Sequence, residues 1–153
     1  MRTRVGINGL GRIGRDVLRG LIERGEKGVD LVAVNDVAPV TTLAHLLRYD
    51  STYGRWPHRV ETAGDYLSID EHSIRACQQP DPARLNWAGL GVDIVVEATG
   101  RFRTATAAGA HLAAGASKVI LTAPGTGVDA TIVMGINHDD YDPTTHHLIS
   151  NAS

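Results

Sequence analysis

The chain has 153 residues, 42% of them hydrophobic, which is enough for one domain with a buried core. Its 15 basic and 17 acidic side chains nearly balance, and no basic stripe suggests nucleic acid as a partner. A single cysteine, Cys77, excludes an internal disulfide. Because the chain does not begin like a signal peptide and no apolar run approaches the ~20 residues of a membrane helix, we expect a soluble, cytoplasmic protein with no membrane contact.

The first third of the chain has the pattern of alternating strands and helices. The apolar run before Asp36 is continuous, which is typical of a parallel strand buried on both faces. In the segment before that run, apolar residues recur at helical spacing and form one buried stripe. The predicted elements are a strand at Arg4–Asn8, a helix at Arg12–Arg24 ended by Gly25 and Gly28, a strand at Val29–Asn35, and a helix at Thr41–Arg48 capped by Thr41 or Thr42.

The middle of the chain alternates apolar and polar residues, which indicates antiparallel strands inserted into this order. They are expected at Arg59–Thr62, Tyr66–Ile69 and Ser73–Cys77. Further strands are expected at Gly91–Glu97, Ser117–Thr122, Thr131–Met134 and His147–Ser150, with an alanine-rich helix at Thr104–Ala114. The whole pattern predicts an α/β fold with a doubly wound, mostly parallel sheet, right-handed crossovers and a small antiparallel insertion.

Three glycines follow the first predicted strand and open the first predicted helix. They are Gly9, Gly11 and Gly14, in the spacing Gly-x-Gly-x-x-Gly. A strand that turns tightly into a helix aims backbone N–H groups and the positive end of the helix dipole at one point, where a pyrophosphate fits. Gly9 would permit the turn, Gly11 the approach of the phosphates, and Gly14 the packing of helix on strand. The segment therefore predicts a dinucleotide-binding loop.

An acidic residue, Asp36, directly follows the second predicted strand, about 20 residues after the third glycine. Dinucleotide-binding folds commonly have at this position the carboxylate that binds the adenosine ribose. A carboxylate accepts hydrogen bonds from ribose hydroxyls and repels a 2′-phosphate, so Asp36 favours NAD over NADP. The alternative is a helix cap or a solvated loop acid. Open α/β sheets bind ligands at the carboxyl ends of their strands, which also draws attention to Thr99, Gly100 and Thr122. For the two threonines, capping explains the residue type equally well.

Several short motifs, in order along the whole chain, resemble glyceraldehyde-3-phosphate dehydrogenase. The motifs are Val5-Gly-Ile-Asn-Gly-Leu-Gly-Arg-Ile-Gly14, Asn35-Asp36, Tyr49-Asp-Ser-Thr-Tyr-Gly54, Ala98-Thr-Gly100, Thr122-Ala-Pro124, Val133-Met-Gly-Ile-Asn-His138 and Ser150-Asn-Ala-Ser153. The resemblance implies a Rossmann-type domain and an oxidation of glyceraldehyde 3-phosphate through a thioester, with hydride passing to NAD. It also implies a cytoplasmic homo-tetramer for the complete enzyme.

The resemblance also assigns cofactor roles to positions of this chain. Arg12 and Ile13 match loop residues that contact the cofactor phosphates, Asp36 matches the ribose acid, and Thr122 matches a hydroxyl near the nicotinamide end. Asn8, Gly9, Thr99 and Gly100 fall on positions that line the family's cofactor groove. Two positions depart from the family: the stretch Gln78–Pro82, with Pro80, lacks an arginine on the adenine side, and Leu10 replaces a phenylalanine.

The family's nucleophilic cysteine follows Ser-Asn-Ala-Ser directly, and this sequence ends at Ser153. We therefore expect residues 1–153 to form the NAD-binding domain, with Ser153 beside the substrate, and the catalytic domain to be absent from this chain. No catalytic residue is predicted, and the chain alone should bind NAD without catalysis. Cys77 is expected to be a buried or edge thiol, because no nearby base would activate it.

Two other functions remain open from the sequence. The chain could be a free-standing NAD-binding or sensor module, or a subunit completed by another chain. A different dehydrogenase of similar layout, such as a semialdehyde dehydrogenase, fits poorly with the Tyr-Asp-Ser-Thr and Ser-Asn-Ala-Ser segments. The cluster of His138, Asp139, Asp140 and Asp142 has no metal-motif spacing, so we expect a solvated loop there and no metal site.

Overall fold

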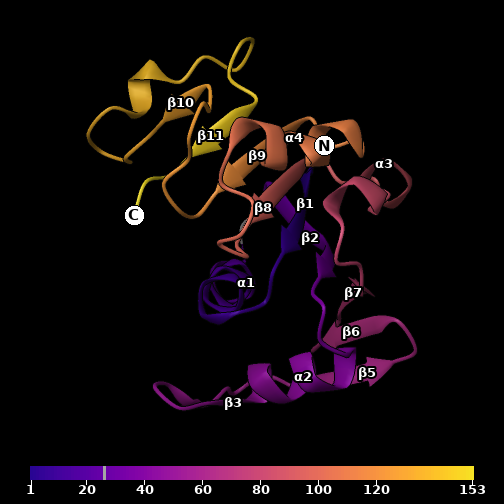
Figure 1. Cartoon of the computed structure of the whole chain (residues 1–153). Coiled ribbons are helices and arrows are strands. Elements are labelled where there is room, and N and C mark those ends of the chain that lie inside the picture. Colours follow the sequence, from indigo (N-terminus) through magenta and orange to yellow (C-terminus); the bar gives the residue numbers. More distant parts are fainter. Residues whose placement is uncertain (26) are drawn as a thin grey trace.

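The computed structural model describes residues 1–25 and 27–153. Its elements alternate between strand and helix from β1 to α2 and again from α3 to β9, with a run of short strands between (Figure 1). In chain order they are β1 (Thr3–Asn8), α1 (Arg12–Arg24), β2 (Val29–Asn35), α2 (Val40–Arg48), β3 (Tyr49–Asp50), β4 (Gly54–Arg55), β5 (Val60–Ala63), β6 (Tyr66–Ile69), β7 (His72–Cys77), the 3-10 turn η1 (Pro82–Arg84), α3 (Trp87–Leu90), β8 (Ile94–Glu97), α4 (Ala105–Ala113), β9 (Lys118–Leu121), β10 (Ala130–Thr131), the 3-10 turn η2 (His138–Asp140) and β11 (Leu148–Ser150).

One large sheet has the strand order β10-β11-β9-β8-β1-β2-β7-β6-β5. From β10 to β7 all neighbouring strands run parallel, and β5, β6 and β7 pair antiparallel. The predicted doubly wound sheet with a small antiparallel insertion is therefore confirmed. The chain moves outward from β1 in one direction through β2 and in the other through β8, so the sheet has its switch point between β1 and β8.

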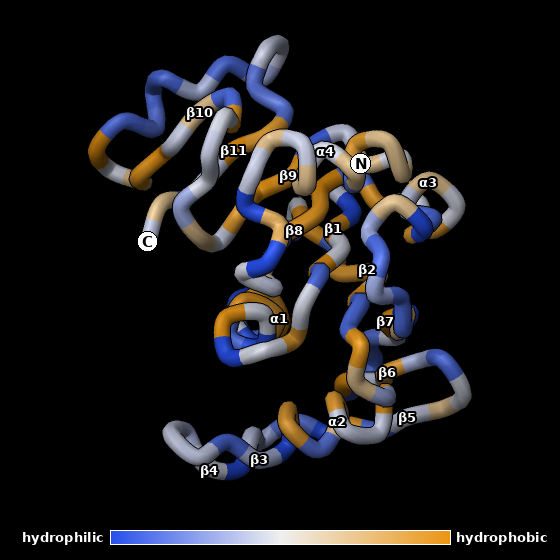
Figure 2. The backbone as a smooth tube through the Cα atoms, viewed as in Figure 1, coloured by the Kyte–Doolittle hydropathy of each residue, from blue (hydrophilic) through white to orange (hydrophobic). Residues whose placement is uncertain are grey.

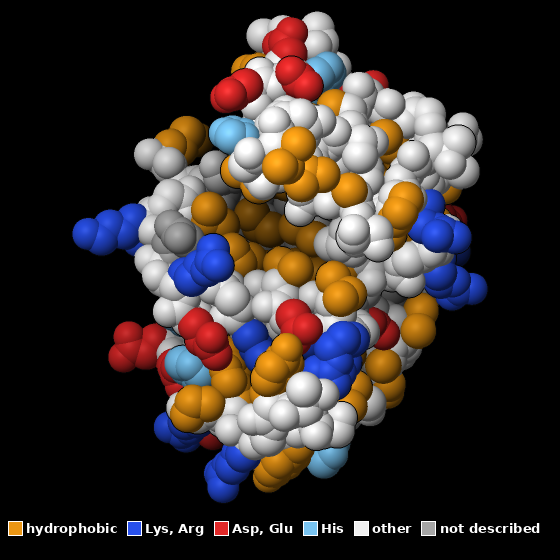
Figure 3. All heavy atoms as spheres, turned by 90° about the vertical axis from the view of Figure 1, so that its left-hand side faces the viewer, with side chains coloured by type: hydrophobic (Ala, Val, Ile, Leu, Met, Phe, Trp, Pro, Cys, Tyr) orange, Lys and Arg blue, Asp and Glu red, His pale blue; other side chains and the backbone are white. Residues whose placement is uncertain are grey.

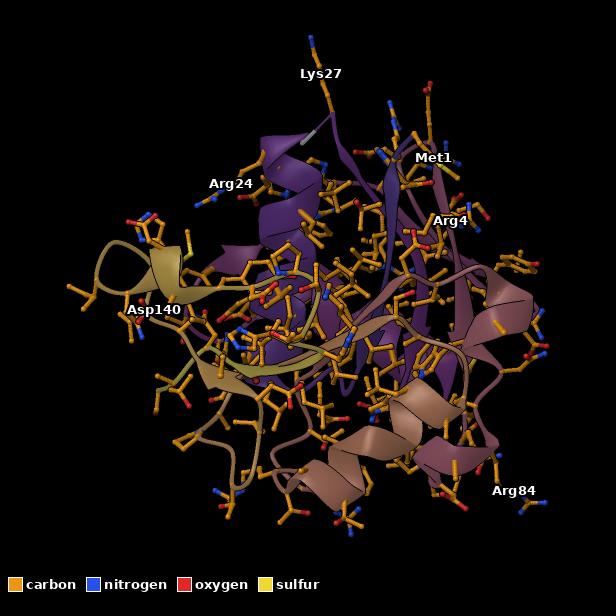
Figure 4. All side chains as sticks on the ribbon, turned by 90° about the horizontal axis from the view of Figure 1, so that it is seen from above. Met1, Arg4, Arg24, Lys27, Arg84 and Asp140 are labelled. Carbon is orange, nitrogen blue, oxygen red and sulfur yellow. The ribbon has the colours of Figure 1, made fainter. Side chains whose placement is uncertain are left out.

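The β1-α1-β2 and β8-α4-β9 connections run in opposite directions along the sheet, and α1 and α4 lie on its opposite faces, as expected when both connections have the usual right-handed sense (Figure 4). On the first face, Leu18 of α1 and Leu43 of α2 pack against Ile7 and Val34. On the other face, Trp87 of α3 packs against Val95, and α4 packs against β9. Hydrophobic residues concentrate in the central strands, whereas the β3–β4 hairpin is more hydrophilic (Figure 2).

Helix α1 covers β1 and β2 but leaves the same face of β8, β9 and β11 uncovered. Figure 3 shows this side of the molecule, where hydrophobic side chains line a hollow. The groove measures about 520 Å³, and apolar side chains dominate its lining. They include Ile94, Ile120, Ile132, Met134 and Ile149.

Turn chemistry accounts for the main differences from the predicted elements. The strand expected at Thr131–Met134 is wrong beyond Thr131, because the Asn137 side chain accepts from the N–H of Val133 and donates to the carbonyl of Thr131. This bonding closes a turn and overrides the strand preference of the apolar residues. The expected threonine cap of α2 is also wrong, since Pro39 precedes the helix at φ −60° and none of the described side chains caps it.

The third difference lies before β8. Residues Gly91–Asp93 do not extend this strand, because Gly91 ends the short helix α3 in the left-handed conformation. The sequence did not indicate α3, whose four residues are too few to show a helical period.

Candidate functional site

A crevice lies at the carboxyl ends of β1, β2, β7 and β8, at the switch point of the sheet. Its volume is about 230 Å³. The lining residues all belong to loops that follow these strands or to the strand ends themselves: Asn8, Gly9, Gly11, Asn35, Asp36, Val37, Gln79, Pro80, Ala98, Thr99, Arg101 and Phe102. A larger pocket lies between α1 and the β3–β4 hairpin, away from the strand ends. The crevice at the strand ends is the better candidate site, because ligands of open α/β sheets bind there.

The glycine loop forms one wall of this crevice and is closely packed. Gly9 has φ +92°, a backbone conformation that residues other than glycine rarely adopt. A β-carbon at this position would lie 2.8 Å from the backbone nitrogen of Thr99. A β-carbon at Gly14 would overlap the carbonyl oxygen of Gly9. Gly11 faces open space. The first and third glycines therefore bring strand, loop and helix together, and the second leaves room above the loop.

Helix α1 begins directly after Gly11 with its amino terminus at the crevice. Gly11 is its N-cap, and no side chain of the described residues caps the helix there. The first turn of the helix carries no acidic residue. The positive end of the helix dipole and the first backbone N–H groups are thus left available for an anion at the open side of the loop.

Asp36 holds the glycine loop from the neighbouring strand. One of its carboxylate oxygens accepts a hydrogen bond from the Leu10 N–H at 2.7 Å, and the other accepts from the Ala38 N–H at 2.9 Å. Its side chain is half-buried and lines the crevice. Each carboxylate oxygen can accept a second hydrogen bond, so Asp36 can bind a hydroxyl of a ligand while it keeps the loop in place.

Two buried asparagines connect the ends of three strands below the crevice. Asn35 donates to the side-chain oxygen of Asn8 at 2.7 Å and to the carbonyl of Gln79 at 2.8 Å, and it accepts from the Gln79 N–H at 2.8 Å. Asn8 and Asn35 are 2% and 3% exposed. The Asn35–Asn8 bond is buried and the two bonds to Gln79 are partly buried, and together they fix the segment after β7 against the ends of β1 and β2.

The structure brings together five of the predicted site residues, Asn8, Gly9, Gly11, Asp36 and Thr99, around this crevice. Gly14 lies directly beneath the loop against Gly9. The remaining predicted residues lie around the rim or further away. Gly100 is exposed just beyond Thr99, Ile13 is 49% exposed on α1, and Ser153 is exposed. Thr122 follows β9, and its N–H donates to the carbonyl of Glu97.

Arg12 turns away from the crevice. Its guanidinium forms an ion pair with Asp50, the buried carboxylate of the β3–β4 hairpin, which also binds Arg19. Any contact between Arg12 and a ligand at the loop would therefore come from its backbone N–H. No local sequence pattern indicates this pairing, because Arg12 and Asp50 meet only where the hairpin folds back along α1.

Residues outside the predicted set of site residues complete the crevice. Val37 and Pro80 lie on the side of Asp36, and Arg101 and Phe102 lie on the side of Thr99. Each follows the end of a parallel strand by a few residues, and this position relative to the strand ends is the signal that would have found them. Val37, Pro80 and Phe102 add apolar surface to the crevice.

The Asp50 cluster leads to a prediction about pH. Hydrogen bonds from the Tyr53 and Thr52 N–H groups and from Arg12 hold the pKa of Asp50 well below its usual range. A carboxyl with a lowered folded pKa adds stability above its unfolded pKa of about 3.9, and this stability is lost as the pH falls below that value. We expect the urea midpoint of Asp50→Asn to lie well below that of the unchanged chain at pH 6, and the difference to shrink steadily below pH 4.

A surface pair serves as the control for this measurement. Glu61 binds the exposed Arg59, and Glu61→Gln should change the midpoint little at any pH. If the midpoint difference for Asp50→Asn stayed the same at pH 6 and pH 3, the ionised carboxylate would not be the source of the stability.

Cys77 is half-buried in β7, and burial raises the pKa of its thiol, which keeps it protonated and unreactive at neutral pH. Within residues 1–25 and 27–153 no group of three or more histidine, cysteine or acidic side chains is arranged to hold a metal ion. In the same residues no helix has the length and apolar character that crossing a membrane requires.

Residues 3–105 match the family model for the glyceraldehyde 3-phosphate dehydrogenase NAD binding domain. A glyceraldehyde-3-phosphate dehydrogenase of Kitasatospora aureofaciens is 54% identical over 151 residues, which are 99% of this chain and 45% of the relative. That of Geobacillus stearothermophilus is 50% identical over 153 residues, and that of Streptomyces coelicolor is 48% identical over 153 residues, in each case 100% of this chain and 45% of the relative.

The chain spans about half the length of these curated relatives. The match begins in β1, includes the glycine loop and the strand ends around the crevice, and reaches the start of α4. Sequence motifs, sheet topology and family model agree, and the chain therefore belongs to the family of glyceraldehyde-3-phosphate dehydrogenase NAD-binding domains.

Proposed function

We propose that the crevice at the carboxyl ends of β1, β2 and β8 binds NAD, and that residues 1–153 form an NAD-binding domain. The observation that carries this proposal is the close packing of Gly9 and Gly14, which leaves an open N–H-lined surface above Gly11 at the start of α1. A pyrophosphate matches this surface in charge and size. The family to which the chain belongs supports the choice of a nicotinamide dinucleotide.

The residues around the loop fit the remaining parts of the cofactor. Asp36 would accept a hydrogen bond from the adenosine ribose, and Val37, Pro80 and Phe102 offer apolar surface for adenine. On the other side of the loop, Asn8, Thr99 and Gly100 would lie along the path toward the nicotinamide, with Thr122 near its far end. The backbone N–H groups of Arg12 and Ile13 would meet the phosphates at the helix terminus.

Titration calorimetry with NAD and NADP tests this proposal. The 2′-phosphate of NADP would lie beside the Asp36 carboxylate, and the two negative charges would repel each other. We expect NAD to bind at least about tenfold more tightly than NADP, which corresponds to ~1.4 kcal/mol. No binding of NAD to the folded chain, or equal affinity for both cofactors, would contradict the proposed site or its specificity.

We also propose a role for the domain in a protein of the length of its relatives. The cofactor supplies hydride acceptance, and residues 1–153 bind and orient it. A following catalytic half would supply the nucleophilic cysteine next to Ser153 and bind glyceraldehyde 3-phosphate. It would pack over the apolar groove of β8, β9 and β11, and the complete protein would form a homo-tetramer. The groove supports this arrangement, since its apolar lining is otherwise open to water.

A chimera tests the role of the domain. Residues 1–153 joined to the remaining part of the Geobacillus stearothermophilus relative should reduce NAD when glyceraldehyde 3-phosphate and phosphate are supplied, and the chain of 153 residues alone should not. Catalysis by the short chain would overturn this proposal. So would a folded chimera that binds NAD and has no activity.

A further inference from the structure

A buried acid and a buried imidazole lie directly under the crevice, in contact with both of its walls. Glu97 is the last residue of β8 and is 3% exposed, and His111 of α4 is 0% exposed. The His111 Nε2 atom lies 2.6 Å from a carboxylate oxygen of Glu97. A charged or polar pair is costly to bury unless all its hydrogen-bonding groups are satisfied, so the arrangement requires an explanation.

The indole of Trp87 decides where the imidazole proton lies. Its Nε1–H donates to the Nδ1 atom of His111 at 2.9 Å. An indole nitrogen can only donate, so Nδ1 must accept and carry no proton. The proton of a neutral ring then sits on Nε2 and points at Glu97. Trp87 thus fixes one tautomer of His111, the one that can donate to the carboxylate.

Glu97 transmits this arrangement to the cofactor loop. The oxygen that accepts from His111 also accepts from the Asn8 side chain at 2.6 Å. The other oxygen accepts from the backbone N–H of Thr99 at 2.9 Å and from its hydroxyl. The carboxylate therefore fixes Thr99, and the Thr99 backbone is the surface against which Gly9 packs.

The two walls of the crevice are connected through the same carboxylate. On one side the Thr99 hydroxyl accepts from the Arg101 N–H at 3.1 Å, which holds the segment that carries Phe102. On the other side Asn8 accepts from Asn35, and Asn35 holds Gln79 next to Pro80. The spacing of the walls thus depends on one buried carboxylate and on the donor that orients it.

We propose that His111 is a positioning residue for the cofactor crevice: with its tautomer set by Trp87, it orients Glu97 so that both walls are held at the separation that binds the dinucleotide. This inference rests on the proposed binding of NAD. His111 does not line the crevice. Its Nε2 atom lies 2.6 Å from the Glu97 carboxylate and 3.4 Å from the side-chain nitrogen of Asn8, so its effect reaches the crevice mainly through Glu97. In metal sites, removal of a hydrogen-bond partner one layer behind the ligands lowers affinity or activity by about tenfold or more, and we expect a comparable effect here.

Two substitutions at His111 separate positioning from packing. In His111→Gln the side-chain amide can donate to Glu97 as Nε2–H does, and in His111→Leu the volume is kept approximately and the donor is lost. We expect His111→Leu to weaken NAD binding about tenfold in titration calorimetry, and His111→Gln to restore affinity to within about threefold of the unchanged chain. A role in core packing alone predicts that leucine binds NAD as well as glutamine does.

A milder change keeps the test valid if the His111 variants fail to fold. Trp87→Phe removes the indole N–H and leaves the ring of His111 in place. We expect it to weaken NAD binding about three- to tenfold and to allow the second tautomer, which two-bond proton–nitrogen NMR correlations of the imidazole detect. Trp56→Phe is the matched control, because the Trp56 indole N–H also donates to a carboxylate, that of Glu23, outside the crevice.

The possible outcomes distinguish the two proposals. If the unchanged chain binds no NAD, the proposed function fails. If it binds NAD, and Trp87→Phe and Trp56→Phe have the same affinity, or His111→Leu binds as well as His111→Gln, then His111 has no positioning role. Loss of affinity in Trp87→Phe alone, together with the changed tautomer, supports the inference.

Discussion

Gly14→Ala should weaken NAD binding and destabilise the domain. The new methyl group would overlap the carbonyl oxygen of Gly9, and neither atom can move away easily, since one belongs to helix α1 and the other to a loop held by Thr99. Overpacking in a closely packed region costs about 1–3 kcal/mol or more. We expect a clear fall in the urea midpoint. The displaced loop should also lower NAD affinity by at least about tenfold, which corresponds to ~1.4 kcal/mol.

Two other glycines provide matched controls for this result. Gly20 lies in the middle of α1 with open space around it, so Gly20→Ala should stabilise the domain by about 0.5–1 kcal/mol and leave binding unchanged. Gly11→Ala should keep the fold and lose affinity, because its methyl group enters only the space proposed for the phosphates. A Gly14→Ala variant as stable as Gly20→Ala would contradict the close packing of the loop.

The second large effect is expected at Asp36. Asp36→Ala removes the partner of the Leu10 N–H and the acceptor for the adenosine ribose at once. Hydrogen bonds to a charged group contribute about 1.5–3 kcal/mol each, so we expect NAD affinity to fall by about tenfold to more than a hundredfold. The affinity for NADP should fall much less, because the same change removes the repulsion of the 2′-phosphate.

The ratio of the two affinities is therefore the informative measurement for Asp36. Competition titrations with NAD and NADP on Asp36→Ala and on Asp36→Asn separate the charge from the shape of the side chain. Asparagine keeps an acceptor for Leu10 and loses the charge, and it should lower the preference for NAD with less loss of stability. An unchanged preference in both variants would show that Asp36 only anchors the loop.

Local sequence patterns determined the elements that carry the cofactor loop. The bounds of α1 and β2 agree with the prediction, because a helical stripe and a continuous apolar run need only neighbouring residues to be visible. The three glycines and Asp36 were also identified from spacing alone, since they follow strand ends directly. Where turn chemistry competes with strand preference, as at Thr131–Met134, the local pattern was misleading.

The tertiary structure decided everything that depends on the order of strands. Glu97 contacts Asn8 because β8 lies beside β1, although 89 positions separate these residues in the chain. His111 sits in an alanine-rich helix with no local sign of a polar role, and its partners Trp87 and Glu97 come from two other elements. Arg12 meets Asp50 only because the β3–β4 hairpin folds back along α1. Hydrogen bonds between distant segments follow from sheet topology and packing, which no periodicity within one segment encodes.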